Sequence, residues 1–262
     1  MQKQNSMKSI RPRAFSLAEV LITIGIIGIV ATIIMPMMSA QHRERQTTTS
    51  VRKFYSQLTQ SFAKSNAEVG DPTVWSLYFP NSPDGANNLM DVAIGAYYKV
   101  IKDCDSNGGC WADMDIRYLD NTSSGINLST DSSYSTARIV DGLLVATRVL
   151  DPACSLVYGN EKNFTRVCGE VLIDVNGKKP PNQFGYDTFK FYLTKFGFFP
   201  AGERNDLTTT FENHCLDSKY GTGCTGWLIH RSNMDYLHCS DLSWQGKTSC
   251  ANIFNYDHSQ GI

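Results

Sequence analysis

Cysteine is the residue type in this sequence whose chemistry is easiest to anticipate. All eight cysteines lie between residues 104 and 250, and an even number is typical of a disulfide-bonded domain in an oxidising compartment. Eight cysteines allow many pairings, and the sequence alone does not choose among them. The short spacings favour bonds between neighbours, namely Cys104 with Cys110, Cys154 with Cys168, Cys215 with Cys224, and Cys239 with Cys250.

Two other uses of these cysteines fit the sequence less well. A zinc site would need a recognisable ligand spacing, and there is no C-x-x-C pair or zinc-finger pattern among the candidates, which are Cys215, Cys224, His230, His238 and Cys239. A catalytic thiolate would need a histidine that faces it, but the histidines beside Cys215 and Cys239 are chain neighbours, which rarely point at one another. Disulfides therefore explain the cysteines best.

Four side chains with oxygen atoms suggest a different kind of site. Carboxylate and amide oxygens are hard ligands that suit Ca²⁺, and the candidates are Asp174, Asn176, Asn182 and Asp187. Their spacing does not match the EF-hand calcium loop. Asn-Gly and related sequences also form tight turns without a metal. We therefore expect a turn here, with calcium as the alternative.

The overall charge and the motif content argue against several functions. The sequence has 24 Lys and Arg against 25 Asp and Glu, for a net charge of -1. A protein that binds a phosphate backbone normally needs a positive face, so no nucleic-acid partner is indicated. The sequence contains no G-x-S-x-G, H-E-x-x-H, phosphate-loop or G-x-G-x-x-G motif. We expect that the protein is not an enzyme and needs no cofactor.

The N-terminus has the charge pattern of a membrane anchor. Residues 1–14 form a basic leader, whereas residues 15–38, the apolar segment, contain a single charge, Glu19. As a helix the apolar segment spans roughly 36 Å, enough to cross a hydrocarbon core of about 30 Å. Because positive residues stay on the cytoplasmic side, the pattern predicts a single-pass protein with a cytoplasmic N-terminus and everything after about residue 41 outside the cytoplasm.

The periodic pattern continues after the apolar segment, which argues against a cleaved signal peptide. Residues 39–69 alternate apolar and polar positions at helical spacing, so we expect the same helix to continue as an amphipathic half until Gly70. A signal peptide would also be shorter, and Met38 is too bulky for the cleavage site that Ala40 would need. The remaining residues, 70–262, form what we call the head.

The start of the apolar segment resembles a known processing signal. The run Arg13-Ala14-Phe15-Ser16-Leu17-Ala18-Glu19-Val20-Leu21-Ile22 is similar to the N-terminal methylation segment of type IV prepilins and type II secretion pseudopilins. The resemblance implies cleavage between Ala14 and Phe15, methylation of the new amine of Phe15, and an assembly role for Glu19 as the fifth mature residue. Pro36 also matches the family, whereas Ala14 departs from it, because Gly is usual there.

The resemblance also assigns roles within the helix. A carboxylate in an apolar span is costly, so Glu19 needs a partner, and the family implies the amine of Phe15 in a neighbouring subunit. The alternative is that Glu19 reaches the lipid headgroups. Gly25 and Gly28 permit close approach between helices, and Pro36 favours a kink. Ordinary packing of small residues in a membrane explains the glycines equally well.

The sequence of the head predicts a set of short strands. Residues 137–149 predict a hairpin around a tight Asp141-Gly142 turn, and residues 167–175 and 187–193 predict two further strands. Residues 121–135 are rich in Ser and Thr and predict a loop. We interpret the aromatic run near the last strand as core rather than as a carbohydrate-binding surface; it comprises Phe189, Phe191, Tyr192, Phe196, Phe198 and Phe199.

These elements predict an α+β protein with a pilin-like fold. A long N-terminal helix, membrane-spanning and then amphipathic, would pack on an antiparallel β-sheet head with disulfide-linked loops, as the resemblance also implies. Three segments of the head are similar to elements that recur in such proteins, and they are residues 173–189, 224–229 and 233–237. Pseudopilins can bind calcium in a head loop, which keeps the calcium alternative open.

Two functional interpretations remain from the sequence. In the first, the chain is a structural subunit that is processed at its leader and assembled into a type IV pilus or a type II secretion pseudopilus, possibly as a minor subunit. In the second, the helix is an anchor for a tip-located adhesin or binding protein. The resemblance implies as partners other pilin or pseudopilin subunits, the prepilin peptidase, an inner-membrane assembly platform and membrane lipid. It implies an inner-membrane precursor and then an extracellular or periplasmic filament.

Overall fold

The chain forms two compact units, Met1–Arg43 and Glu44–Ile262. A computed structural model describes residues 16–217 and 219–250, without the side chains of residues 33–39. The boundary between the units lies inside the long helix α1 (Leu17–Glu68), which ends one residue before the end we predicted. Most of the second half of the predicted helix, from Glu44 onward, therefore belongs to the same unit as the head.

Helix α1 is continuous over both predicted halves. The α-helical backbone runs through Pro36, and a glycine with a positive φ of 103°, Gly70, follows the end of the helix. Asp71 then caps the next short helical turn by accepting a hydrogen bond from the backbone N–H of Thr73 at 3.0 Å. Within the part of the chain that the structure describes, no helix meets the length and hydropathy expected of a membrane span.

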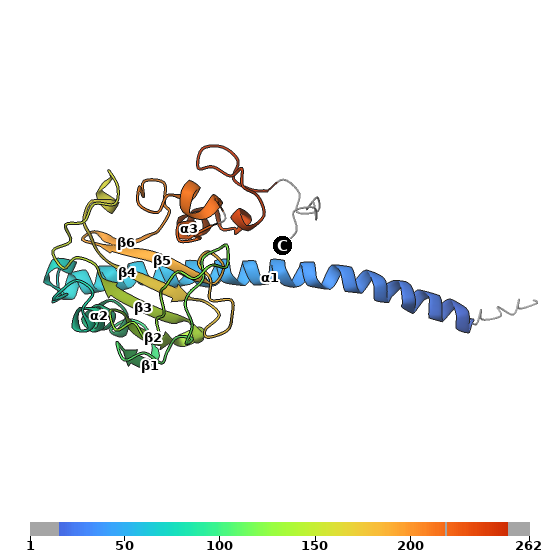
Figure 1. Cartoon of the computed structure of the whole chain (residues 1–262), viewed down its shortest axis with the longest axis horizontal. Coiled ribbons are helices and arrows are strands. Elements are labelled where there is room, and N and C mark those ends of the chain that lie inside the picture. Colours follow the sequence, from blue (N-terminus) through green and yellow to red (C-terminus); the bar gives the residue numbers. More distant parts are fainter. Residues whose placement is uncertain (1–15, 218, 251–262) are drawn as a thin grey trace, which may run out of the picture. The chain divides into compact units, whose positions relative to one another are not determined.

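The second unit is built on one six-stranded sheet (Figure 1). Each strand pairs antiparallel with the next one in the sequence, so the spatial order is the chain order. The strands are β1 (Val100–Asp105), β2 (Ser135–Ile139), β3 (Leu144–Val149), β4 (Val167–Asp174), β5 (Thr188–Thr194) and β6 (Gly197–Pro200). The predicted α+β class, with a long helix and an antiparallel sheet, is confirmed.

The predicted hairpin is the β2–β3 pair. Asp141 and Gly142 lie in its turn with φ values of 68° and 83°, and two positive φ angles in succession are the signature of a tight hairpin turn. The two further predicted strands correspond to β4 and β5. The predicted loop of residues 121–135 is also present, except that its last residue, Ser135, begins β2.

Two longer helices and several short helical turns complete the unit. Helix α2 (Pro83–Met90) begins at Ser82, whose hydroxyl accepts a hydrogen bond from the backbone N–H of Gly85 at 3.1 Å, and α3 (Cys224–Arg231) follows the sheet. Helix α2 packs beside β3, where the hydroxyl of Thr147 donates to the carbonyl of Ala86 at 2.9 Å. The short turns are Pro72–Val74, Asp91–Gly95, Val140–Gly142, Lys162–Phe164, Glu212–Leu216 and Asp235–Leu237.

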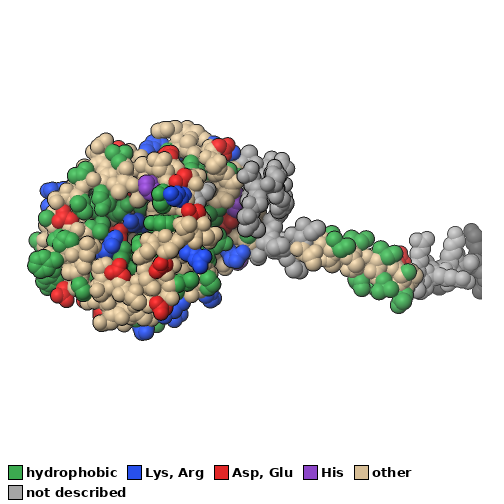
Figure 2. All heavy atoms as spheres, in the orientation of Figure 1, with side chains coloured by type: hydrophobic (Ala, Val, Ile, Leu, Met, Phe, Trp, Pro, Cys, Tyr) green, Lys and Arg blue, Asp and Glu red, His purple; other side chains and the backbone are tan. Residues whose placement is uncertain are grey.

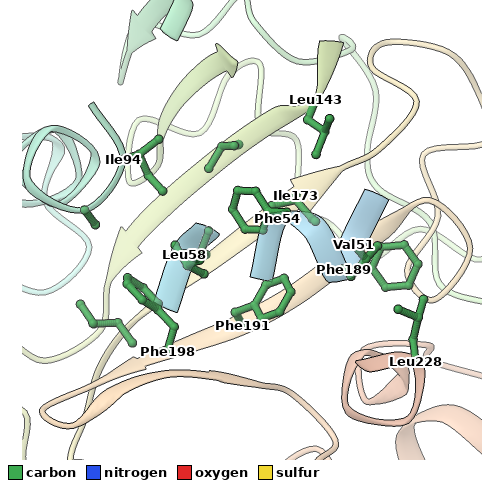
Figure 3. Close-up of a cluster of buried hydrophobic side chains, with 14 of the residues drawn as sticks. Val51, Phe54, Leu58, Ile94, Leu143, Ile173, Phe189, Phe191, Phe198 and Leu228 are labelled. Atoms are coloured by element: carbon green, nitrogen blue, oxygen red, sulfur yellow. The ribbon is translucent and has the colours of Figure 1, made fainter. Parts of the chain in front are cut away.

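The main core lies between the sheet and the second half of α1 (Figure 3). Val51, Phe54 and Leu58 recur at helical spacing and are completely buried against the sheet. The ring of Phe54 lies 5.8 Å from that of Phe191, and the backbone carbonyl of Phe54 accepts a hydrogen bond from the hydroxyl of Tyr98 at 3.0 Å. Four members of the predicted aromatic core are thus buried, namely Phe189, Phe191, Tyr192 and Phe198. The prediction is wrong for Phe196, which is 37% exposed because it lies in the turn between β5 and β6.

The opposite face of the sheet is covered by loops. Trp111, Ile116, Leu128 and Tyr134 come from the connection between β1 and β2, and they form a second buried cluster with Leu144, Ala146, Leu172 and Phe184. Backbone hydrogen bonds hold this cover in place, since the N–H of Ile116 donates to the carbonyl of Ile126 at 2.8 Å and the N–H of Arg117 donates to the carbonyl of Asn182 at 2.9 Å.

Candidate functional site

Two reciprocal hydrogen bonds cap the N-terminus of α1. The hydroxyl of Ser16 accepts from the backbone N–H of Glu19 at 3.2 Å, and a carboxylate oxygen of Glu19 accepts from the backbone N–H of Ser16 at 3.5 Å. This arrangement is a capping box, in which Ser and Glu three residues apart satisfy backbone donors at the beginning of a helix. Glu19 therefore has a local partner that the sequence interpretation did not assign to it.

The described part of the apolar segment buries little of its surface within the chain. Figure 2 shows hydrophobic side chains over the first turns of α1. The large exposed ones are Leu17, Val20, Leu21, Ile22, Ile24, Ile26, Ile27, Ile29 and Val30. A cluster of this kind marks an interaction site for protein or lipid, because exposed apolar patches are unfavourable in water.

The two glycines of the apolar segment have open space beside them. A side chain built on Gly25 or Gly28 would meet no atom within 4 Å, so neither glycine is needed for packing within the chain. Pro36 lies in the helix, but its side chain is outside the described residues, as are the predicted cleavage and methylation residues Ala14 and Phe15. The predicted pairing of Glu19 with the amine of Phe15 stays a prediction for the same reason.

All eight cysteines are joined in four disulfides. The bonds link Cys104 to Cys110, Cys154 to Cys168, Cys215 to Cys224, and Cys239 to Cys250. These are the neighbouring pairs that the short spacings favour. His230 and His238, which we weighed as zinc ligands, instead contact carboxylates, and their Nε2 atoms lie 3.3 Å from Glu203 and 2.9 Å from Glu44.

A buried ion cluster lies on the loop-covered face of the sheet. Glu170 of β4 is buried and opposes Arg148 of β3 directly, and its oxygens lie 2.6 Å from an Arg148 Nη and 3.0 Å from Lys190 Nζ. The hydroxyl of Tyr134 donates to the same carboxylate at 2.6 Å. Burial alone would raise the pKa of Glu170, but the two cations and this hydrogen bond lower it to about 2. We interpret this cluster as structural.

The four oxygen-bearing residues proposed as calcium ligands come together at the end of β4. Asn176 joins the two acids, since its backbone N–H donates to Asp174 at 2.9 Å and its side-chain amide donates to Asp187 at 2.8 Å. Asp187 also accepts from the backbone N–H groups of Asn182, at 3.0 Å, and of Gln183. These are the turn-forming hydrogen bonds that we expected from Asx residues.

Burial makes this loop electrostatically unusual. The pKa of Asp174 is raised to about 8 by burial and by the nearby Asp187, and burial raises the pKa of Asp187 to about 6. Among the described residues, no group of three or more His, Cys, Asp or Glu side chains is arranged to hold a metal ion. Any metal here would therefore rely on amide oxygens as well as on the two carboxylates.

A basic pocket opens beside this loop. It has a volume of about 590 Å³, and its charged lining residues are Arg138, Asp141, Lys178 and Lys179. Asp141 is already paired with Lys53 at 2.5 Å, and Lys178 donates to the carbonyl of Gly109 at 2.9 Å. Two hairpin turns, at residues 140–142 and near residue 177, form its rim, so the pocket is a product of the tertiary structure.

Two models of known protein families match the chain, one over its N-terminal segment and one over most of the rest. Residues 37–258 match the model of a family of unknown function, DUF6613. The chain belongs to the DUF6613 family. Residues 11–35 match the prokaryotic N-terminal methylation motif, so this DUF6613 member is a type IV pilin-like protein with a prepilin-type N-terminus. No curated protein and no solved structure matches the chain.

Two features of the DUF6613 chain were not predicted from its sequence, namely the capping box at the start of α1 and the buried ion cluster around Glu170. The capping box was present as Ser16 followed three residues later by Glu19, a pattern that is itself a signal for the start of a helix. The cluster around Glu170 had no such signal. Arg148, Glu170 and Lys190 lie on three different strands, and only the strand register brings them together.

Proposed function

We propose that this protein is a prepilin-like structural subunit that assembles through its N-terminal helix into a type IV pilus or a type II secretion pseudopilus. The observation that carries the proposal is the exposed apolar face of residues 17–32 in a chain that matches the methylation motif. In a filament, neighbouring helices would cover this face. Before assembly, membrane lipid would cover it, with the N-terminus in the cytoplasm.

The two glycines of the apolar segment support helix packing between subunits. Gly25 and Gly28 lie three residues apart, and the space beside each of them is open. Residues three apart share one face of a helix, so another helix can approach closely there. The partners of this face are other pilin or pseudopilin subunits, and the prepilin peptidase and an inner-membrane assembly platform act on the precursor.

The head supports a structural role more than a catalytic one. Its cysteines are in disulfides. The carboxylate of Glu170, whose pKa is lowered to about 2, forms ion pairs with Arg148 and Lys190. Such a network stabilises a fold and does not offer a free acid or base. The head would lie outside the cytoplasm, in the periplasm or on an extracellular filament.

The deciding experiment separates the charge of Glu19 from its cap. Glu19→Gln keeps a capping side chain but removes the charge, whereas Ser16→Ala keeps the charge and removes the reciprocal hydroxyl. If Glu19 pairs with the amine of a neighbouring subunit, E19Q reduces incorporation into sheared filaments about tenfold or more, and S16A assembles nearly normally. Immunoblots of the filament fraction measure both.

The membrane fraction provides the control for this experiment. Wild type, E19Q and S16A should reach the membrane in equal amounts, because removing a charge from an apolar helix does not hinder insertion. The opposite pattern, with normal assembly of E19Q and failure of S16A, would show that Glu19 acts only as a cap. Normal filaments from both variants would overturn the assembly role of this residue.

A tip-located binding role is the second candidate, and the basic pocket favours it. The pocket lies at the ends of two hairpins and presents Arg138 and Lys179 to solvent. A minor subunit at a filament tip could use it to contact a surface, DNA or secreted cargo. Gold labelling of this subunit on native filaments distinguishes the two roles, because a shaft subunit is labelled along the filament and a tip subunit only at its end.

A further inference from the structure

The basic pocket beside the β2–β3 hairpin carries more positive charge than the fold itself uses. Its lining contains three cations, Arg138, Lys178 and Lys179, against one acid, Asp141. That acid is already neutralised by Lys53, whose Nζ lies 2.5 Å from it. Within the part of the chain that the structure describes, the side chains of Arg138 and Lys179 make no hydrogen bond or ion pair. The pocket therefore has an excess of positive charge that no described residue balances.

The register of the sheet places a further cation next to Arg138. Lys102 of β1 lies directly opposite Arg138 of β2, and both residues are exposed. The ammonium group of Lys102 also has no ion pair among the described residues. Like charges directly opposite each other on neighbouring strands destabilise a sheet. An anion bound at this place would relieve the repulsion.

The walls of the pocket are held in place before any ligand binds. A side chain added at Gly142 would come within 3.9 Å of an Arg138 Nη atom, so the guanidinium group lies against the hairpin turn. A side chain added at Gly177 would lie 3.3 Å from the carbonyl oxygen of Gly142, so the two turns at the rim approach closely. Lys178 donates to the carbonyl of Gly109 at 2.9 Å, which ties one turn to the loop that the first disulfide closes. Preformed walls lower the entropic cost of binding.

The pocket has apolar walls as well as cations. Leu144 of β3 is the pairing partner of Arg138, so the two side chains share the loop-covered face of the sheet (Figure 1). Leu144, Val175 and Cys110 form the apolar part of the lining. The volume of about 590 Å³ lies in the range of pockets that enclose a small organic ligand. A ligand that fits therefore combines a compact body, at least one apolar face and an anionic group.

Two common kinds of anionic partner meet these requirements less well. Single-stranded nucleic acid binds to a track of cations with aromatic side chains that stack on its bases, and the lining of the pocket contains no aromatic residue. A single acidic side chain of a partner protein is much smaller than the ligands that pockets of this volume enclose. A sugar ring that bears a carboxylate has apolar C–H faces, and its carboxylate suits the forked donors of a guanidinium group.

We propose that the basic pocket binds an acidic sugar unit of a polysaccharide, an inference that rests on the tip-located binding role proposed above for the same pocket. The carboxylate of the sugar would lie on Arg138 and Lys179, and its ring against Leu144 and Val175. The ammonium group of Lys178 gives one of its three N–H donors to Gly109, so it can give another to a ring hydroxyl.

Titration of the full-length protein with sodium glucuronate tests this site. The protein is kept in a detergent without sugar headgroups, and binding is followed by saturation-transfer NMR of the ligand. We expect a dissociation constant of about 1 mM, which is ordinary for a ligand of this size. Glucose has the ring without the carboxylate, and acetate has the carboxylate without the ring. Each should bind at least about tenfold more weakly than glucuronate.

The variant Arg138→Gln tests the assigned cation. R138Q should bind glucuronate at least about tenfold more weakly, because glutamine lacks the charge and the forked donors of arginine. Arg166→Gln is the matched control, since Arg166 is exposed, makes no ion pair among the described residues and precedes β4, whereas the pocket lies beyond the other end of that strand. R166Q should bind like wild type, and neither variant should lower the melting temperature.

Four results would overturn the proposal. Equal affinity for glucose and glucuronate would exclude a charged site, and equal affinity for acetate would exclude a role for the ring. Equal affinity of R138Q and wild type would place the ligand elsewhere. Tighter binding of a single-stranded oligonucleotide than of glucuronate would assign the pocket to nucleic acid.

Filament assembly separates this inference from the proposed function. R138Q and R166Q should enter filaments like wild type, because the pocket is far in the sequence from the apolar segment and neither residue belongs to it. Normal filaments from a protein that does not bind glucuronate would overturn the sugar site alone. Gold labelling along the whole shaft, with glucuronate binding intact, would overturn the tip location and support the sugar site.

Discussion

Ser16 and Glu19 cap the start of α1 through two reciprocal hydrogen bonds. The backbone nitrogen of Glu19 lies 3.2 Å from the hydroxyl oxygen of Ser16, and the backbone nitrogen of Ser16 lies 3.5 Å from a carboxylate oxygen of Glu19. The same carboxylate thus caps the helix of its own chain and is exposed, as the proposed contact with a neighbouring subunit requires. Carboxylates near a helix N-terminus are also favoured by the helix dipole. The cap therefore gives Glu19 a structural role that is separate from its proposed role in assembly.

The first prediction concerns processing of the N-terminus. Cleavage should fall between Ala14 and Phe15 and leave an N-methylated Phe15, because residues 11–35 match the methylation motif. Intact-mass and N-terminal peptide analysis of protein from the native host measures this. A mature N-terminus near Gln41 would remove the apolar segment and would be incompatible with assembly through it.

The second prediction concerns the helix–sheet core. Phe54→Ala should lower the free energy of unfolding by about 3–5 kcal/mol, since Phe54 is 1% exposed and its ring fills the space between α1 and β5. Urea denaturation of the full chain, followed by tryptophan fluorescence, measures the change. Phe79→Ala is the control, because Phe79 is 73% exposed and its loss should change stability by less than about 0.5 kcal/mol.

The third prediction concerns the ion cluster of Glu170. Glu170→Gln should destabilise the protein by about 3 kcal/mol at pH 7, because Arg148 and Lys190 then lose their counter-ion in a largely buried site. The pKa of Glu170 is lowered to about 2 in the folded state, so its contribution is complete above about pH 4.5. It is lost as the pH falls from there toward 2.

Urea denaturation at several pH values checks this prediction. The difference between wild type and E170Q should be constant above about pH 5 and should shrink toward pH 2. Glu212→Gln, at an exposed position, is the control and should match wild type throughout. A difference that does not change with pH would mean that the effect arises from packing and not from charge.

The fourth prediction concerns the stability of the head at higher pH. In the folded state the pKa of Asp174 is raised to about 8 and that of Asp187 to about 6, above their unfolded values. Their stabilising contribution is therefore complete below about pH 4 and is lost as the pH rises to about 8. The melting temperature should fall over this range, and that of Asp174→Asn should fall less than that of wild type.

The fifth prediction concerns the disulfides. Thiol labelling under denaturing, non-reducing conditions should find no free cysteine among the eight. Removing the bond between Cys154 and Cys168, which closes a loop of 14 residues, should cost about 3 kcal/mol because the unfolded chain gains freedom. The double variant Cys154→Ser/Cys168→Ser measures this. Two or more labelled cysteines in protein from an oxidising compartment would contradict the assignment.

The sequence by itself determined the features that depend on neighbouring residues. Helix α1, the Asp141-Gly142 turn and the favoured disulfide pairs all follow from short-range patterns, because helical spacing, turn chemistry and short loops involve residues close in the chain. The capping box of Ser16 and Glu19 belongs to the same class, and its signal was present in the sequence.

The tertiary structure alone decided which charges are buried and what they contact. Arg148, Glu170 and Lys190 are far apart in the sequence and meet only because β3, β4 and β5 pair in one register. Asp174 and Asp187 read as ordinary turn residues, and only the packing of the surrounding loops removes them from water and shifts their pKa values. Burial is a property of the whole fold, so no local pattern predicts it.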